Sequence, residues 1–561
     1  MPVRFQHLHT YFLLPVSIDK QAVAEDHPAV FCKHPSWING LEEWLEHEPH
    51  EVGRRFASRL GGWKRAAYTT FDIDSPAYQD MVFFHPFVRR VFFDSAEKFT
   101  DATENESLLQ CFEIPLAGGK LWFDAEDAKG RRAKVAITDL RLFLFANGIA
   151  ILSIGVEALH LTAAQALWIN EMLRKIYPSS RRQLREGRVP KRMAFVWEPD
   201  RGEPEVLVEE TFDKVEMSGF QPPLARTIQA LLYFADYPRQ EYEPVLDERM
   251  IVYTYATVDP SSVPEDFVKS DDYEVLLSRL LYVDRAGENY RYDPAFVSSE
   301  MYRQMYRRWA HQGTYYGFTS YSNITCSIGS FDCDEHDLRE GFLIHRMFTT
   351  RYYLMALVAL FYRATLLDFA ERTALVSRRL YVDQQSHRLS SDNIRIASDL
   401  RSEFLHFSNY WYFDELANKD EENEHFLMQI REFRVESMKR EVEEEVDKLN
   451  HSLHNYHQFR NTEAVNRLAM LSLILGAGAV VTGFFGMNFA GSFAKTLFEP
   501  AAFPHWASIA FVTIFAVSTL SFGIYVVTSN WSDYRESLLP RWWLSRKARY
   551  MGSLRRSTPE A

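Results

Sequence analysis

Two long stretches without charge near the C-terminal end constrain what this chain can fold into. Residues 468–488 and 506–527 contain no Asp, Glu, Lys or Arg. A helix needs about 20 apolar residues to cross the hydrocarbon core of a bilayer, and both stretches are long enough. The alternative is two buried helices of a soluble protein, which stretches of this length disfavour. We therefore expect two membrane spans, residues 468–488 and 506–530.

Flanking charges predict how these spans are oriented. Arg460 and Arg467 precede the first span, and a cluster of Arg and Lys follows the second in residues 531–561. The connecting residues 489–505 hold only Lys495 and Glu499 as charged side chains. The positive-inside rule then places both termini in the cytoplasm and the loop outside an inner or plasma membrane. The basic tail is suited to anionic lipid.

Composition limits the partners of the remaining chain. A net charge of −13 over 561 residues argues against nucleic acid and is compatible with attraction of cations. Four cysteines without a CxxC pair suit a reducing cytoplasm, and the first 20 residues do not resemble a signal peptide. No cofactor is expected. Motifs for nucleophilic catalysis and for phosphate or dinucleotide binding are missing from the sequence, so we expect no enzyme.

Residues 1–385 show a mixture of strand and helix patterns, which predicts an α/β or α+β cytoplasmic domain, with about 1–110 as an additional region. A hairpin is expected around Asn147-Gly148, a dipeptide typical of a type I′ turn. Residues 352–362 are strongly apolar but short, so we expect a buried helix there. Further strands are expected at 5–14, 81–94, 107–116, 119–123, 193–197 and 250–258, and helices at 161–177, 224–233 and 272–283.

Residues 390–467 form a predicted helical stalk, with one helix up to about residue 416 and an acidic break at 420–424. Because no Pro or Gly follows before the first span, one helix is expected from about 426 to 485. Apolar residues recur on one face at about 3.5-residue spacing. They are Val442, Val446, Leu449, Leu453 and Tyr456. The opposite face carries Glu444, Asp447, His451, His454, Gln458 and Asn461.

The same phase continues into the first span. Small residues on one face of a membrane helix permit close packing or border a narrow path. Ordinary helix packing is one interpretation of such a stripe. Because this face becomes polar and acidic below the membrane, we favour the wall of a water-filled pathway around a symmetry axis. The predicted pore-lining residues are Val465, Leu468, Ser472, Gly476, Ala479 and Gly483.

Gly486-Met487-Asn488 closes the first span. This tripeptide, after a long cytoplasmic helix and before a second C-terminal span, resembles the CorA-type magnesium transporter family over about residues 431–531. The resemblance implies a funnel-shaped homopentamer whose first spans line a central pore. It implies an external selectivity ring at Gly486-Met487-Asn488, with Asn488 as the metal contact, and an apolar constriction at Val465 and Leu468.

The function that this resemblance implies is inward transport of Mg²⁺, or of Co²⁺ or Ni²⁺, down the electrochemical gradient. It also implies carboxylates that sense cytoplasmic Mg²⁺ between subunits. The chain departs from the family in its outer loop, where Glu499 is the one carboxylate and the usual Met-Pro-Glu-Leu is missing. The proline of the first span is missing as well, and Ala477 stands near its place.

Other interpretations stay open. His451, His454 and His457 suit a Zn²⁺ transporter of the same fold, although we favour a solvated helix face as their explanation. Cys326, Cys333 and His336 suggest a metal loop, but their spacing does not match usual zinc sites. A membrane-anchored scaffold or sensor with a vestigial pore is the alternative of a different class. The acidic groups at 420–424 and 441–447 are interpreted as solvated surfaces.

Overall fold

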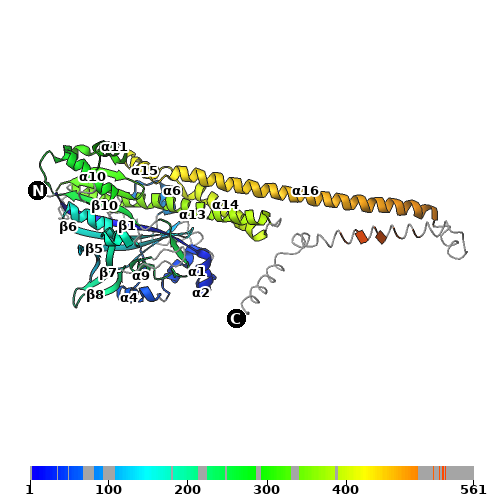
Figure 1. The fold of residues 1–561 in the computed structure, drawn as a ribbon, viewed down its shortest axis with the longest axis horizontal. Coiled ribbons are helices and arrows are strands. Elements are labelled where there is room, and N and C mark those ends of the chain that lie inside the picture. The colour runs from blue at the N-terminus through cyan, green and yellow to red at the C-terminus, as the bar shows by residue number, and fades with distance from the viewer. Residues whose placement is uncertain are drawn as a thin grey trace. The chain divides into compact units, whose positions relative to one another are not determined.

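The computed structural model describes residues 3–489 except 35, 48–49, 67–80, 93–107, 178–180, 213–223, 247–248, 286–291, 330–339 and 386–389. Separate helical positions between 510 and 525 are also described. The chain divides into two compact units, Met1–Asn450 and His451–Ala561, which are treated one at a time. Their boundary falls inside one helix, α16 (Val435–Phe489), yellow to orange in Figure 1.

Unit 1 is built on a 13-stranded mixed sheet with the order β11-β12-β13-β10-β1-β6-β5-β4-β7-β8, with β2, β3 and β9 off this path. Among the described strands only β10 and β13 pair in parallel, so the fold is α+β. The strands are β1 Arg4–Ile18, β2 Lys64–Arg65, β3 Leu109–Glu113, β4 Gly119–Asp127, β5 Arg132–Phe145, β6 Ile149–Thr162, β7 Pro190–Pro199, β8 Glu205–Thr211, β9 Tyr242–Pro244, β10 Ile251–Val258, β11 Met305–Tyr306, β12 Tyr315–Phe318 and β13 Ser322–Ile328.

Helices cover both faces of this sheet. In unit 1 they are α1 Lys20–Asp26, α2 Pro28–Phe31, α3 Leu41–Leu45, α4 Glu51–Leu60, α6 Pro86–Phe92, α7 Ala163–Leu173, α8 Arg181–Arg185, α9 Arg226–Leu231, α10 Asp271–Tyr282, α11 Pro294–Gln304, α12 Glu340–Thr349, α13 Arg351–Gln385, α14 Ser391–His406 and α15 Asp420–Glu432. Short 3₁₀ turns lie at Trp37–Gly40, Pro260–Ser262, Phe267–Lys269 and Ala310–Gln312, and a π-helical turn lies at Phe407–Trp411.

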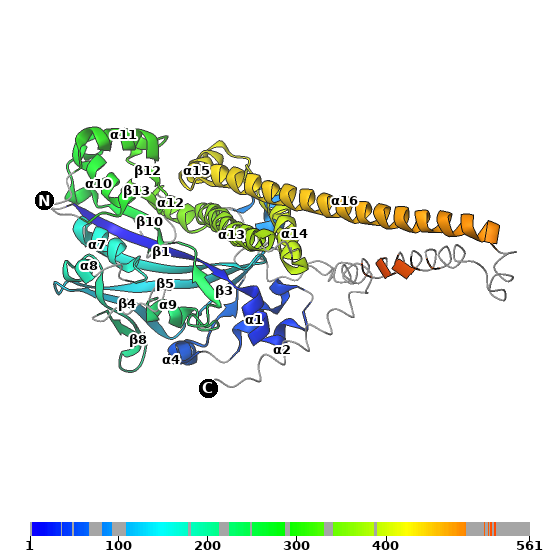
Figure 2. The ribbon, with the colours of Figure 1, turned by 45° about the vertical axis from the view of Figure 1, so that its right-hand side comes forward.

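Strand β1, dark blue in Figure 2, is buried on both faces. Its neighbours in the sheet are β6 and β10. Phe12 packs into the core that α7 closes, whereas Tyr11 on the opposite face contacts Tyr353 of α13, with ring centroids 4.6 Å apart. A strand covered on both faces tolerates few charged side chains, and residues 5–18 contain no Asp, Glu, Lys or Arg.

Helix α13 covers the face of the sheet opposite to α7. The stretch Ile344–Asp383 comprises the end of α12 and most of α13. It is long and apolar enough to cross a membrane, and it is the one such stretch among the described residues. However, 78% of the most apolar 18-residue segment of this stretch is buried. Phe361 stacks on Phe145 of β5 at 4.2 Å between ring centroids. The prediction of a buried helix at 352–362 is confirmed.

Local sequence signals predicted several elements correctly. The β5–β6 hairpin is confirmed, but its loop is not type I′, because it has three residues and only Gly148 takes a positive φ, 99°. A type I turn followed by one left-handed residue closes such three-residue loops. Helix α7 is confirmed and begins at a capping box formed by Thr162 and Gln165.

Two predictions of local structure are wrong. Residues 86–92 form α6 in place of a strand, because Pro86 suits the first helical position and the buried Val88, Val91 and Phe92 follow helical spacing. The acidic residues at 420–424 do not interrupt a helix. They open α15, since carboxylates are favourable at a helix N-terminus.

A buried polar contact holds α7 to the sheet. Asn170 Oδ1 accepts a hydrogen bond from Thr10 Oγ1 at 3.0 Å, and its Nδ2 donates to Thr254 Oγ1 at 3.1 Å. We expect Asn170→Ala to lower the free energy of unfolding by about 2 kcal/mol, because two buried hydroxyls each lose a partner. Chemical unfolding of the full chain measures this. The same change at exposed Asn455 should stay within about 0.5 kcal/mol of the wild type, and equal effects at both positions would contradict the assignment.

Candidate functional site

Helix α16 is the element that carries the predicted ion pathway. It has 55 residues, about 83 Å at 1.5 Å per residue. The backbone of Gly486-Met487-Asn488 lies in its last turn, since the helix continues to Phe489. The expected start near residue 426 is wrong. α15 ends at Glu432, and Arg434 adopts a left-handed conformation with φ of 58° before α16 begins.

The break at Arg434 has a packing reason. Phe433 and Val435 flank Arg434 and are both buried, with exposed fractions of 1% and 0%. In addition, the Arg363 guanidinium lies over the Phe433 ring, 5.2 Å from its centroid. Tertiary burial of these two neighbours therefore overrides a sequence without Pro or Gly.

Residues 442–461 of α16 have the apolar face and the polar face that the sequence predicted. Val442 and Val446 are buried, whereas the polar face is exposed. The exposed residues are Glu444, Asp447, His451, His454, Gln458 and Asn461. Lys448 Nζ lies 3.4 Å from Glu444 Oε2, one helical turn away. This face presents carboxylates and imidazoles to solvent in the single chain.

Residues 465–483 of α16 are exposed along the face that was predicted to line the pore. Val465 and Leu468 have exposed fractions of 62% and 50%. Ser472, Gly476, Ala479 and Gly483 are also exposed and recur three or four residues apart, which places them on one helix face. A Cβ atom added to Gly476 or Gly483 would meet nothing within 4 Å among the described atoms. Among the described residues, this face is therefore exposed in the single chain.

Several predicted residues lie outside the described part of the chain. These are Glu499 with most of the loop 489–505, nearly all of the second span 506–530, the tail 531–561, and Cys333 with His336. Cys326 is described, and it lies buried in β13, where Tyr273 Oη donates to its Sγ at 3.8 Å. Burial raises the pKa of the Cys326 thiol to about 12, so this side chain is protonated and is a poor metal ligand.

Of the acidic residues at 420–424, Asp420 is exposed as predicted, whereas Glu421 and Glu422 are not part of a solvated surface. Glu422 is buried, and its Oε1 lies 2.6 Å from Arg351 Nη1 of α13. Glu421 Oε1 accepts hydrogen bonds from Trp309 Nε1 at 3.0 Å and from Tyr352 Oη at 3.1 Å. These carboxylates hold α15 in place and are already paired within their own chain. By contrast, Glu441, Glu443, Glu444, Glu445 and Asp447 are exposed, as predicted.

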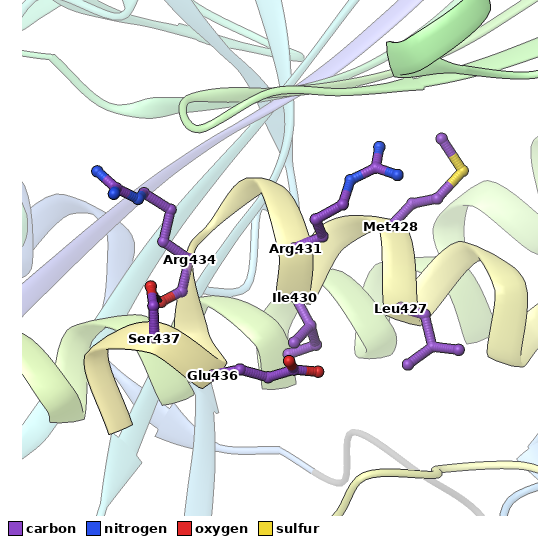
Figure 3. A pocket seen from close by; sticks show the side chains of 7 residues that line it. All are labelled: Leu427, Met428, Ile430, Arg431, Arg434, Glu436 and Ser437. Atoms are coloured by element: carbon purple, nitrogen blue, oxygen red, sulfur yellow. Dashed lines mark hydrogen bonds between the residues drawn. The ribbon is translucent and has the colours of Figure 1, made fainter. Parts of the chain in front are cut away.

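A pocket of about 500 Å³ lies at the junction of α15 and α16 (Figure 3). Its lining combines apolar side chains with two guanidinium groups, from Arg431 and Arg434, and one carboxylate, from Glu436. The remaining lining residues are Leu427, Met428, Ile430 and Ser437. Since two positive groups outnumber the single carboxylate, this pocket does not favour a divalent cation.

One cluster of potential metal ligands was missed by the sequence analysis. His7, His9, Glu157 and His345 bring their ligand atoms within 4.8 Å of one another. The alternation of His7 and His9 along a strand was the available signal, but nothing local in the sequence connects them to Glu157 or His345. Burial, then the neighbouring histidines, lowers the pKa of His9 well below its usual value, and burial lowers that of His345 to about 4.

His425 of α15 makes the stability of this junction depend on pH. It lies among the rings of Tyr306, Tyr316 and Tyr352, and among the described residues its Nε2 makes no hydrogen bond. Burial, then the charges of Arg351 and Arg308, lowers its pKa from 6.5 to about 3. Between these two pH values the unfolded chain binds a proton that the folded chain excludes, so stability falls as the pH falls.

We therefore expect His425→Leu to remove part of the acid sensitivity of unfolding. Relative to the wild type, the variant should gain up to about 1.4 kcal/mol for each pH unit below 6.5. Unfolding of both proteins between pH 7 and pH 5 measures this gain. The matched change at the exposed His311 should leave the pH dependence as it is, and parallel curves for His425→Leu and the wild type would refute the explanation.

Replacement by glycine should have opposite effects on stability at two positions, Arg434, the left-handed residue between α15 and α16, and Arg440 inside α16. Arg434→Gly should raise the free energy of unfolding by about 1 kcal/mol, because only glycine takes this conformation without steric cost. The same replacement at Arg440, exposed inside α16, should lower it by about 1 kcal/mol. Thermal or chemical unfolding of the two variants checks both signs, and a loss of stability for Arg434→Gly contradicts the assignment.

The comparison with known proteins agrees with the family resemblance that Gly486-Met487-Asn488 suggested. The family model described as CorA-like Mg²⁺ transporter protein matches residues 384–527. This stretch contains α14, α15, the whole of α16 and most of the second predicted span. A search of curated proteins found no match. The resemblance predicted from Gly486-Met487-Asn488 is confirmed, since residues 384–527 of this chain match the CorA-like Mg²⁺ transporter family model.

Proposed function

We propose that this protein transports divalent metal cations across a membrane through a pore lined by α16, and that Mg²⁺ is its main substrate. One observation carries the proposal. α16 runs without interruption from Val435 through the first charge-free stretch to Gly486-Met487-Asn488, inside the region that matches the CorA-like family model. Its exposed face changes from acidic and polar residues to small residues along the way.

The assembly that the resemblance to the CorA-type family implies is a homopentamer, and the exposed face of α16 is compatible with it. Exposed glycines and a serine on a membrane helix gain little from lipid, but they permit close approach of neighbouring helices around a shared axis. Each subunit would then contribute two spans, residues 468–488 and 506–530, with the loop 489–505 outside and both termini in the cytoplasm. Residues 1–385 and the stalk 390–467 would form the cytoplasmic part.

The chemistry of the pathway follows from its residues. Mg²⁺ loses its hydration shell reluctantly, so a ring of Asn488 amide oxygens and backbone carbonyls can hold the hydrated ion by accepting hydrogen bonds from its water. Val465 and Leu468 would form an apolar constriction that closes by dewetting. Below it, Glu444 and Asp447 would line a vestibule that attracts cations.

The membrane potential would supply the driving force. A divalent ion that crosses 100 mV gains about 4.6 kcal/mol, so inward movement needs no further energy source. Outside, each loop would contribute one carboxylate, Glu499, with Lys495 four residues away. These two charges nearly cancel, and we infer that ion capture depends on the Asn488 ring more than on the loop.

We expect the purified protein in liposomes to show flux of at least one of Mg²⁺, Co²⁺, Ni²⁺ and Zn²⁺ when a negative interior potential is imposed. Asn488→Ala should reduce the initial rate by about tenfold, because the loss of a hydrogen-bonding amide costs roughly 1–1.5 kcal/mol of ion binding. Met470→Ala, placed by the helical phase on the opposite face, is the matched control and should retain the wild-type rate.

The outcomes separate the alternatives. A flux specific for Zn²⁺ that disappears in His451→Ala/His454→Ala would support a zinc transporter of the same fold. No flux for any of the four ions, with wild type and Asn488→Ala alike, would refute transport and favour a membrane-anchored scaffold.

A further inference from the structure

A second place for a metal ion lies inside unit 1, far along the chain from the proposed pore residues. Strand β1 places His7 and His9 on the same sheet face, because alternate residues of a strand point the same way. Glu157 of β6 is directly opposite His9 in the β1–β6 pairing. Helix α12 covers this face and brings His345 against both histidines, with ring centroids 4.8 Å from His7 and 5.2 Å from His9.

The potential ligand atoms are close enough for a single ion. His7 Nε2 lies 2.5 Å from Glu157 Oε1, and His9 Nδ1 lies 2.9 Å from His345 Nε2. All four ligand atoms lie within 4.8 Å of one another. A tetrahedral Zn²⁺ ion with bonds of about 2.0–2.1 Å separates its ligands by about 3.3 Å. Small rotations of these side chains would therefore exchange two hydrogen bonds for four metal bonds.

The surroundings of the cluster resemble those of a built metal site. His7 is fully buried and His9 nearly so, whereas the Glu157 side chain is 36% exposed, which leaves a route from solvent. Tyr255 packs 5.1 Å from His345 and Phe348 packs 5.7 Å from His9, measured between ring centroids, so apolar rings restrict how the imidazoles turn.

A neighbouring hydroxyl selects the ring nitrogen that is available to an ion. Thr138 Oγ1 lies 3.4 Å from His9 Nε2, at the far side of the ring from His345. A second-shell hydrogen bond of this kind fixes the tautomer of a metal-binding histidine. With its proton on Nε2, His9 presents the Nδ1 lone pair to the cluster.

We propose that His7, His9, Glu157 and His345 bind one transition-metal ion of the Zn²⁺ class and thereby fasten α12 to strands β1 and β6. Three imidazoles and one carboxylate suit Zn²⁺, Co²⁺ or Ni²⁺, whereas Mg²⁺ and Ca²⁺ prefer oxygen ligands alone. The site is independent of the proposed transport function, because it shares no residue with α16. A closed hydrogen-bond network that never takes up metal is the competing interpretation.

Titration of the full-length protein with Co²⁺ tests the proposal. The protein is kept in detergent micelles, stripped with a chelator and titrated with Co²⁺ alone. Tetrahedral Co²⁺ absorbs visible light far more strongly than octahedral Co²⁺ because its site lacks an inversion centre, so ions hydrated in a pore contribute little signal. We expect one strongly absorbing Co²⁺ per chain, displaced by Zn²⁺ but not by excess Mg²⁺.

Variants assign the signal to the cluster. Glu157→Gln keeps the size of the side chain and a contact with His7, and should raise the Co²⁺ dissociation constant by about tenfold or more, as even second-shell changes do. His345→Ala, at the half-buried position, should abolish the signal. The control variant His451→Ala/His454→Ala removes two exposed histidines of α16 that lie outside the cluster. It should bind Co²⁺ as the wild type does.

Stability supplies a second readout. Zn²⁺ should raise the melting temperature of the wild type and of the His451→Ala/His454→Ala control, and should leave that of His345→Ala unchanged, since a ligand stabilises only the state that binds it. Melting without metal shows whether each variant is folded. Absence of the tetrahedral signal in the folded wild type, an equal signal in folded Glu157→Gln, or displacement by Mg²⁺ would overturn the proposal.

Discussion

Burial of β1 on both faces is the constraint on which the rest of unit 1 depends. One face requires α7, which is held by the contacts of Asn170 with Thr10 and Thr254. The other face requires α13, whose Tyr353 packs on Tyr11 and donates a hydrogen bond to Ser153 of β6. Because α13 is thereby fixed, it can present Arg351 to α15, which leads directly into α16.

The carboxylates of α15 and those of α16 lie in different environments. Glu421, Glu422 and Glu424 of α15 pair with groups of their own chain, and removal of one partner from a buried pair such as Arg351–Glu422 costs about 3–5 kcal/mol. These contacts hold α15 against its neighbours, so these carboxylates have a structural role. Those of α16, among them Glu444 and Asp447, stay exposed. Of these two groups, the second is the one that faces solvent in the described part of the chain.

The two proposed ion sites differ in ligand chemistry, and this difference keeps them separate. Amide and carbonyl oxygens at Gly486-Met487-Asn488 suit a hard ion that retains its water, whereas the imidazoles of His7, His9 and His345 suit a softer ion that has lost it. Mg²⁺ at concentrations that load the first site would therefore leave the second to Zn²⁺ or a similar metal. The two proposals together would let one chain bind both ions without competition between them.

The sequence by itself determined the features that depend on short-range periodicity. These are the two charge-free stretches, the two faces of α16, helix α7 and the tripeptide that resembles the family motif, since helix period involves residues at most four apart. Tertiary packing alone set the break at Arg434 and the pairing of Glu422, because each depends on which neighbours bury those side chains. The same holds for His9 and His345, which are 336 residues apart and meet only because sheet register and the packing of α12 bring them together.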